Sequence, residues 1–483
     1  MSEYAKISKN SGYAFLSTFF RLFANIILFW IIARFYGKEI FGQFTTAQTF
    51  AAMCVLVADF GLDVLLTTEI PRNINNTAVL FRRYFSIKLV LTSIASIGML
   101  LIAVISDFNV QTKYLIIIFS FYASFTTLTN FLYALYKGNE KLQYEAKVSF
   151  IINFGALIII LFLIFLQQSI IVLAITFSAT RLLGMFIAIY YAYHLVPDLK
   201  FKVEFKETKN VLSQVMIFGM FLIFGNLFFQ LDTILLAFLK GEESVGIYQA
   251  VFRLIVLPLL IPEVIINSLL PTLSRLNSAD NAKWQRLSEI FNKFLLIISF
   301  PISIVIYLFA DIIIGIVYGT AEYSIAIPIL RIFAFIVFIR FCFEGNGLIL
   351  TTSKRQKTRM QIVFIATLFN LILNYFLIPK YGIFGAAYVS LFTNVFVAIA
   401  YFIATKKSVG SPIHTMLSLQ FVSIILFLLL SSLLLDYLKV GYLGLISILI
   451  YFYFVIMFVM TKQEKNYFKE LSILKINRNS KQT

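Results

Sequence analysis

The sequence predicts an all-α membrane protein with about fourteen transmembrane helices, and three observations support this fold class. Hydrophobic residues fill 60% of the 483 positions and charged residues only 13%, roughly half the usual globular share, so a water-soluble fold could not cover its own apolar surface. The apolar residues come in long runs that short polar turns separate. One hairpin-like stretch also recurs further along the chain, which indicates an internal repeat.

Fourteen apolar runs are long enough to cross a membrane, because a hydrocarbon layer of about 30 Å needs about 20 helical residues. We expect spans at residues 12–35, 40–66, 84–106, 114–136, 146–166, 170–193, 211–239, 245–270, 291–310, 323–350, 360–378, 383–404, 416–435 and 441–460. The first twelve spans form two lobes of six helices related by pseudo-symmetry. The last two form an additional C-terminal pair.

The connecting segments define the expected domain boundaries. We predict an N-terminal six-helix lobe at 1–194, a cytoplasmic linker at 195–210, a C-terminal six-helix lobe at 211–405, an extra two-helix hairpin at 406–461 and a basic cytoplasmic tail at 462–483. No loop is large enough for a soluble domain, so the function is expected to lie within the membrane.

The distribution of positive charge predicts the topology. The net charge is +17, and most Lys and Arg residues, Lys88 among them, are expected on the same side as the N-terminus. Because cytoplasmic loops carry an excess of these residues, both termini are expected in the cytoplasm. This topology accounts for the basic character without a nucleic-acid partner. The polar N-terminus leads into an apolar run too long for a signal-peptide core, so we expect it to be retained.

The sequence offers no enzymatic, metal or cofactor site. Cys54 and Cys342 lie far apart in apolar runs, and the chain contains only two His. There is no Asp-x-Asp pair to hold a metal and a sugar nucleotide, and every outer turn is short. We therefore expect neither a cofactor nor catalysis.

The repeat aligns residues 226–263 with residues 22–59, at an offset of 204 positions. In the alignment Gly37 matches Gly241, Gly42 matches Gly246, Phe44 matches Tyr248 and Asp59 matches Glu263. We interpret the four glycines mainly as structural, since each hairpin must reverse within a few residues. Transporters are often built from such repeats, with the substrate site near the bilayer midplane between them.

Three motifs carry a resemblance to a known family: GKEIFGQFTTAQTFAAMCVLVADFGLDVLLTTEIPRN from Gly37, QLDTILLAFLKGEESVGIYQAVFRL from Gln230, and YGIFGAAY from Tyr381. Together they resemble the polysaccharide flippases, which include the O-antigen or repeat-unit translocases of the multidrug, oligosaccharidyl-lipid and polysaccharide (MOP) transporter superfamily. The similarity in layout covers nearly the whole chain. It departs from the family at Thr68, since an Arg often precedes the Glu that is Glu69 here.

The resemblance implies a MATE-like fold and a function. Such proteins move undecaprenyl-diphosphate-linked oligosaccharide repeat units from the inner to the outer leaflet of the bacterial plasma membrane, by alternating access, for surface polysaccharides such as O-antigen or capsule. The implied partners are the polyprenyl-diphosphate-linked oligosaccharide, membrane lipid, H+ or Na+, and polymerase and chain-length proteins of the same pathway.

Five arginines lie within predicted spans: Arg21, Arg181, Arg253, Arg331 and Arg340. Each costs at least about 2.5 to 3.5 kcal/mol at a helix centre, so these side chains should face protein or a hydrated cavity. One interpretation is that they bind the diphosphate and an acidic glycan, because guanidinium offers a planar fork of donors to phosphate oxygens. The alternative is that they form buried ion pairs between helices.

Three buried carboxylates are candidates for coupling transport to an ion gradient. We expect this role for Asp232 and Glu263, and next for Asp59, because a carboxylate in a low-dielectric site can bind and release protons. The sequence does not distinguish H+ from Na+.

Other functions stay open at this point. One is an ion-coupled drug or metabolite antiporter of the same superfamily, although the excess of intramembrane Arg argues against cationic substrates. An exporter of lipid II or teichuronic acid would differ only in the glycan. A membrane-embedded polysaccharide polymerase is the most distant alternative.

Overall fold

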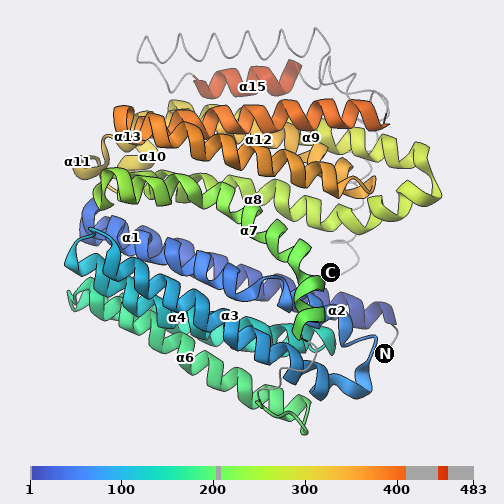
Figure 1. The fold of residues 1–483 in the computed structure, drawn as a ribbon. Coiled ribbons are helices and arrows are strands. Elements are labelled where there is room, and N and C mark those ends of the chain that lie inside the picture. The colour runs from blue at the N-terminus through green and yellow to red at the C-terminus, as the bar shows by residue number, and fades with distance from the viewer. Residues whose placement is uncertain (1–2, 203–207, 410–443, 455–483) are drawn as a thin grey trace, which may run out of the picture. The chain divides into compact units, whose positions relative to one another are not determined.

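The computed structural model describes residues 3–202, 208–409 and 444–454, and its regular elements are helices (Figure 1). They are α1 (Glu3–Asp59), α2 (Leu62–Glu69), η1 (Ile74–Asn76), α3 (Thr77–Ile105), α4 (Val110–Gly138), α5 (Leu142–Phe165), α6 (Ile170–Leu195), α7 (Thr208–Lys240), α8 (Glu242–Ala279), α9 (Asn281–Leu308), α10 (Ala310–Val317), α11 (Thr320–Tyr323), α12 (Ala326–Thr352), α13 (Gln356–Val409) and α15 (Gly444–Phe454).

Ten helices among the described residues are long and apolar enough to cross a membrane. They overlap the first twelve predicted spans, because α1 and α13 each run through two spans that meet at a kink at Gly37 or Gly382. The span predicted at 40–66 is interrupted, since α1 ends at Asp59 and α2 begins at Leu62. The all-α, multi-pass prediction is therefore confirmed for this part of the chain. The span predicted at 416–435 lies outside the described residues, and α15 lies within the span predicted at 441–460.

Glycines make three of the helix reversals. Gly37, Gly241 and Gly382 have φ angles of 76°, 81° and 56°. Residues with a Cβ rarely adopt this left-handed region, whereas glycine enters it at little cost. The turns predicted at these positions are thus present.

Gly42 and Gly246 have a different role from the turn that the sequence suggested. A Cβ on Gly42 would lie 1.7 Å from the carbonyl oxygen of Glu242, and a Cβ on Gly246 would lie 1.9 Å from that of Lys38. Lys38 and Glu242 are also 204 positions apart. Helices α1 and α8 therefore make the same backbone contact twice. In each contact a glycine of one copy of the repeat faces a carbonyl of the other copy, as in a pair related by a two-fold axis. The absent side chains let the two helices approach closely.

The chain divides into two compact units by packing. The first unit holds the residues up to Arg253 together with Val317–Ile325 and Val363–Val389. The second holds Leu254–Ile316, Ala326–Ile362 and the residues from Ser390 onward. Helix α8 thus passes from one unit to the other between Arg253 and Leu254. The division into lobes at 1–194 and 211–405 stays a prediction.

In the first unit, α4 lies beside α1, α3 and α6 (Figure 1). Phe81, Phe131 and Tyr136 are fully or almost fully buried in a hydrophobic cluster of this unit. Close packing recurs between α5 and α6, where a Cβ on Gly184 would overlap the side chain of Ile152.

In the second unit, α9 and α12 form the main helix pair. Trp284 of α9 donates a hydrogen bond of 3.1 Å to Thr352 of α12, and the Asn292 amide donates to Asn346 at 3.3 Å. Tyr451 of α15 packs on Phe300 with ring centroids 4.9 Å apart.

The helix turns of the first unit are joined to one another by polar contacts. The contacts are Tyr36 Oη to the Gln168 carbonyl (2.6 Å), the Lys38 amide to Glu322 (3.1 Å), the Asn109 amide to Glu242 (3.2 Å) and Lys240 Nζ to the Pro379 carbonyl (2.9 Å). Tyr318 donates to the Ala250 carbonyl at 3.0 Å, and burial raises the pKa of Tyr318, which keeps this hydroxyl a donor. The kink at Gly37 within α1 and the turns after α3, α5 and α7 thus lie at the same end of the unit, as helices that cross a membrane in alternation require.

Candidate functional site

Arg253 is held between the two copies of the repeat. It lies on α8, donates from Nη2 to Gln48 Oε1 of α1 at 2.7 Å, and stacks over the Phe29 ring with Cζ 3.8 Å from the centroid. Its Nε is buried without a hydrogen-bond partner in the described structure. One face of the guanidinium is therefore covered, while part of its donor fork is unused. Such a group can hold an anion without an energetic need to break an ion pair first.

Asp232 of α7 is the centre of a buried polar network in the same unit. Its carboxylate accepts from Tyr248 Oη at 2.5 Å, from Asn370 Nδ2 at 2.9 Å and from Asn374 Nδ2 at 2.6 Å. These three donors are uncharged. The carbonyl oxygen of Asn374 is buried without a partner in the described residues. Carboxylate and amide oxygens of this kind suit a small hard cation or a proton.

Arg181 and Arg21 lie in the helices of the first six predicted spans. Arg181 of α6 donates to Asn153 Oδ1 of α5 at 3.1 Å and lies 5.3 Å from the Tyr122 ring centroid. Its Nε is also buried without a partner in this part of the structure. Arg21 of α1 is exposed.

Asp59 belongs to an ion cluster that the sequence analysis missed. Lys88 of α3 is fully buried, and its Nζ lies 2.8 Å from Asp63 and 3.2 Å from Asp59. Asp59 also accepts from the Asp63 amide at 3.0 Å, just after the break between α1 and α2 at Phe60 and Gly61. Lys88 thus lies inside the helix bundle, within the span predicted at 84–106, and not in a cytoplasmic loop. Lysine is strongly favoured in such loops, but here two carboxylates stabilise it inside a helix bundle.

The remaining candidates lie in the second unit. Arg331 of α12 lies 5.6 Å from the Tyr307 ring centroid, and Arg340 of the same helix is half-buried. Glu344, four residues after Arg340 on the same helix, lies with its Oε1 3.9 Å from Arg359 Nη2. Glu263 of α8 is exposed. The structure thus groups Arg21, Arg181, Arg253, Asp59 and Asp232 in the first unit and Glu263, Arg331 and Arg340 in the second.

The residues that sequence reasoning missed are mostly uncharged. Asn370 and Asn374 are separated by four positions in an apolar run, a spacing that puts both amides on one helix face. This pattern was visible before the fold was known. Gln48 offered no comparable signal, because its role depends on the approach of α1 and α8. Arg72, three residues after Glu69, forms a salt bridge of 2.8 Å with it. In the family an Arg often directly precedes this Glu, whereas here that position is Thr68.

Long apolar helices, glycine turns and buried charged side chains define this chain as a multi-pass membrane protein with a transporter fold. The solved structures that it resembles share this fold. The lipid II flippase MurJ in its inward closed conformation is 18% identical with a TM-score of 0.72, over 94% of this chain and 98% of that one. An inward-facing multidrug resistance MATE family transporter of the MOP superfamily is 13% identical with a TM-score of 0.65, over 80% of this chain and 94% of that one.

The family follows from a direct sequence match. The polysaccharide biosynthesis protein family matches residues 7–277, more than half of the chain, and the MatE family matches residues 211–376. The protein therefore belongs to the polysaccharide biosynthesis protein family, which confirms the resemblance found in its motifs. The probable flippase AglR of Haloferax volcanii is 29% identical over 202 residues, which are 40% of this chain and 41% of that relative.

Proposed function

We propose that the protein flips a lipid-linked oligosaccharide across the membrane by alternating access. The substrate is an undecaprenyl-diphosphate-linked repeat unit that moves from the inner to the outer leaflet of a bacterial plasma membrane, with both termini in the cytoplasm. Family membership and the flippases among its relatives support transport over catalysis.

The observation that carries the proposal is the environment of Arg253. A guanidinium within a membrane-spanning helix is costly, and its retention indicates a function or a fixed partner. Here the partner is the neutral Gln48, and Nε is left without a bond in the described structure. Because the bonded partner is neutral, the guanidinium can take an incoming anion such as a diphosphate. Arg181, with its own unbonded Nε, and Arg21 contribute further positive charge to the same unit.

We assign substrate contact first to these three arginines. Arg331 and Arg340 are proposed as additional contacts for the glycan from the second unit. Partners of the same pathway, a polymerase and a chain-length protein, would receive the flipped repeat unit.

The coupling site in this proposal is the Asp232 network. The carboxylate and the unbonded Asn374 oxygen would bind H+ or Na+, and the bound cation would change the hydrogen bonds that tie α7 to α8 and α13. Such a change in contacts is what allows an ion to bias one conformation over another. Glu263 and Asp59 remain secondary candidates for this role.

Reconstituted vesicles that contain labelled undecaprenyl-diphosphate oligosaccharide test the proposal. We expect Arg253→Lys to lower the initial flipping rate about tenfold, because lysine keeps the charge and loses the planar fork. Arg21→Ala combined with Arg253→Ala should abolish flipping. Arg355→Ala removes an exposed arginine outside the spans and serves as the control. An unchanged rate in the double variant would falsify the assignment of the arginines to the substrate.

A further inference from the structure

A short segment, Val317–Ile325, crosses the kink in α1, and we call it the strap. It contains the end of α10, the helix α11 and the turn that leads to α12 (Figure 1). The strap packs with the first unit, whereas the residues before it, up to Ile316, and after it, from Ala326, belong to the second unit. A movement of the second unit therefore pulls on the strap through the chain at both of its ends.

The strap binds backbone groups on both sides of the kink at Gly37. The Tyr323 hydroxyl donates to the Ala33 carbonyl at 3.1 Å, in the last turn before the kink. The Glu322 carboxylate accepts from the Lys38 amide at 3.1 Å, in the first turn after it. Such terminal carbonyls and amides have no partner within their own helix, so the strap caps both halves of α1. Gly37 also leaves room for the strap, since a Cβ there would overlap the Glu322 carboxylate.

On α1, the strap also binds next to the Arg253 site. The Val317 carbonyl accepts from Trp30 Nε1 and, at 3.3 Å, from Arg34 Nη1. Trp30 directly follows Phe29, the ring on which Arg253 stacks. Because α1 starts in the cytoplasm in the proposed topology, the residues from Trp30 to the kink lie on the outward side of that ring.

On α8, the strap approaches the same site from the partner helix. Tyr318 Oη donates to the Ala250 carbonyl at 3.0 Å, about one helical turn before Arg253. Tyr318 and Tyr323 are both buried, with ring centroids 5.1 Å apart. Connecting segments usually run over the surface, so two buried tyrosines indicate a defined docked position. Since α8 runs inward from Glu242, the docked strap lies on the outward side of Arg253 on this helix too.

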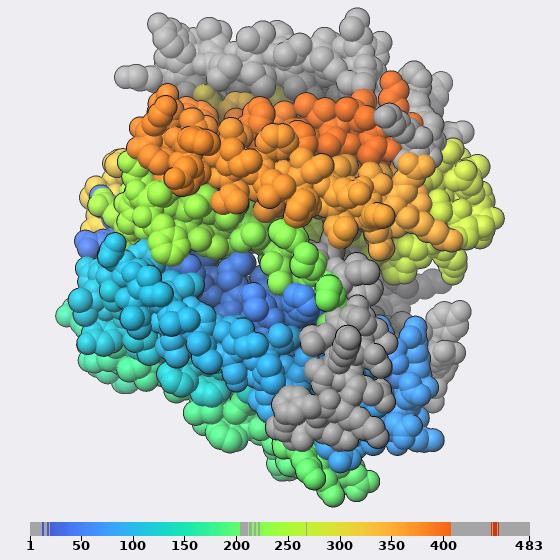
Figure 2. Space-filling model, viewed as in Figure 1, coloured from blue at the N-terminus to red at the C-terminus, as the bar shows by residue number. Residues whose placement is uncertain are grey.

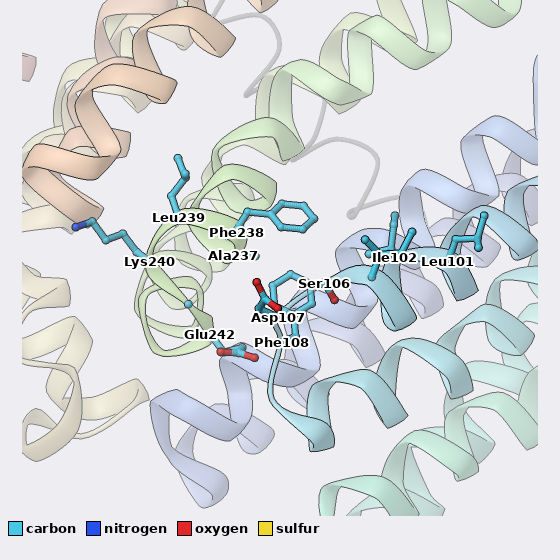
Figure 3. A pocket seen from close by; sticks show the side chains of 12 residues that line it. Leu101, Ile102, Ser106, Asp107, Phe108, Ala237, Phe238, Leu239, Lys240 and Glu242 are labelled. Carbon is cyan, nitrogen blue, oxygen red and sulfur yellow. The ribbon is translucent and has the colours of Figure 1, made fainter.

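The other copy of the repeat has a matching contact. Lys38, whose amide binds Glu322, matches Glu242 at the offset of 204 positions. Glu242 in turn accepts from the Asn109 amide at 3.2 Å, in the turn between α3 and α4. Figure 3 shows Glu242 and Phe108 of this turn, which line one cavity. Each copy of the repeat is thus contacted, at the start of its second helical half, by a turn between two later helices.

The two turns differ in how the chain holds them. Helices α3 and α4 both belong to the first unit, and Figure 2 shows them in lighter blue on its surface. The turn between them is therefore fixed to the unit that it contacts. The strap contacts the first unit but is continuous with the second at both ends. Of the two contacts, the strap is the one that a relative movement of the units must break.

We propose that the strap is a releasable outer gate. When docked on α1 and α8 it blocks the path from Arg253 to the outside, and it leaves both helices when the transporter opens outward. This inference rests on the proposed flipping by alternating access. Release is possible because water at the outer end replaces the hydrogen bonds of the strap, and each such bond has a small net free energy. Thr320, Glu322 and Ser324 are already exposed in the docked strap.

Distances between two spin labels measure the release without any substrate. One label replaces Thr320 in the strap and the other replaces Val110 at the start of α4, and both positions are exposed. Cys54→Ala and Cys342→Ala first remove the two native thiols. We expect two distances, of which the longer belongs to the released strap. A single distance under inward-facing and outward-facing conditions alike would overturn the inference.

The carboxylate of the strap should control the balance between these states. Glu322→Gln should raise the ratio of released to docked strap about fivefold, because it weakens a charge-assisted hydrogen bond. Glu243→Gln is the matched control, since Glu243 pairs with Lys38 Nζ at 2.8 Å and lies outside the strap. It should leave the ratio unchanged. An equal response of the ratio to both variants would contradict a specific role of Glu322.

A reversible cross-link tests whether release is needed for flipping. Lys38→Cys with Glu322→Cys, joined by a short reducible bis-maleimide, should lower the flipping rate at least tenfold, and a reductant should restore it. Asp107→Cys with Glu242→Cys joins the α3–α4 turn to α8 across the cavity of Figure 3, and its cross-link should leave the rate unchanged. Full flipping with the strap cross-linked would overturn the inference. Two spin-label distances in a protein that does not flip the labelled lipid would instead contradict the proposed substrate and support a moving strap.

Discussion

In the first copy of the repeat, Asp59 contacts Lys88, whereas in the second copy the matching Glu263 is exposed. The position that matches Lys88 at the same offset of 204 residues is Asn292, a buried neutral amide that bonds Asn346. Where the acid is partly buried, a cation accompanies it, and where the acid is exposed, the corresponding position is neutral. The two copies thus share the glycines that set their backbone, while each copy balances its own charges.

Removal of Lys88 should have the largest effect on this comparison. Lys88→Met leaves the partly buried Asp59 and Asp63 without their cation and should lower the free energy of unfolding by about 3 to 5 kcal/mol, measured by unfolding in mixed micelles. The triple variant Lys88→Met with Asp59→Asn and Asp63→Asn restores neutrality and should recover most of the loss. If the triple variant is as unstable as the single one, charge balance is not what the cluster provides.

The glycine contact should be next in size. Gly42→Ala and Gly246→Ala each place a methyl group against a backbone carbonyl and should cost about 1 to 3 kcal/mol. Because the two contacts are equivalent, the two losses should agree to within about 0.5 kcal/mol. Gly98→Ala is the matched control, since a Cβ there meets nothing within 4 Å. Clearly unequal losses would show that the repeat is not symmetric at this contact.

A substitution of Asp232 should distinguish a role in folding stability from a role in coupling flipping to an ion gradient. Asp232→Asn keeps the shape of the side chain and should change the free energy of unfolding by only about 1 kcal/mol, because Tyr248 can still donate to its amide oxygen. Flipping in vesicles should lose its dependence on the applied ion gradient. Asp59→Asn, measured in parallel, should keep that dependence. The opposite pattern would move the coupling role to the first copy of the repeat.

Glu263 should have the smallest effect. An exposed carboxylate with no structural role typically contributes within about 0.5 kcal/mol, so Glu263→Gln should leave the melting temperature nearly unchanged. Differential scanning fluorimetry of the purified variant measures this. A loss as large as that expected for Lys88→Met would mean that the two copies depend equally on their terminal acids.

The helices of the described residues could be predicted from sequence because their signals are local. Runs of about 20 apolar residues mark spans, and Gly37, Gly241 and Gly382 mark turns that need positive φ. The break between α1 and α2 could not be predicted in this way. Phe60 at the break has φ 43° without being glycine, and the surrounding packing, including the contact of its ring with Gly219, sets its conformation.

The candidate site was only partly predictable, because charge identifies a residue and packing identifies its partner. The sequence singled out Arg253 and Asp232, whose cost in a membrane makes them conspicuous. Their partners Gln48 and Asn370 are ordinary polar residues, 205 and 138 positions away in the chain. Lys88 shows the same limit. Its sequence position counts it with the charges that predict topology, but only the fold shows that it is buried and paired with Asp59 and Asp63.

The two equivalent contacts at Gly42 and Gly246 resemble the interface of a homodimer, in which both partners use the same surface. Here both partners are repeats of one chain. Each copy of the repeat supplies one glycine and one facing carbonyl, so both halves of the contact survive when the covalent link is removed. A chain cut between Lys202 and Thr208 should therefore reassemble from two separately encoded fragments that copurify. Gly246→Leu in the second fragment alone should prevent that assembly, which would make the glycine pair a practical point for splitting and recombining related chains.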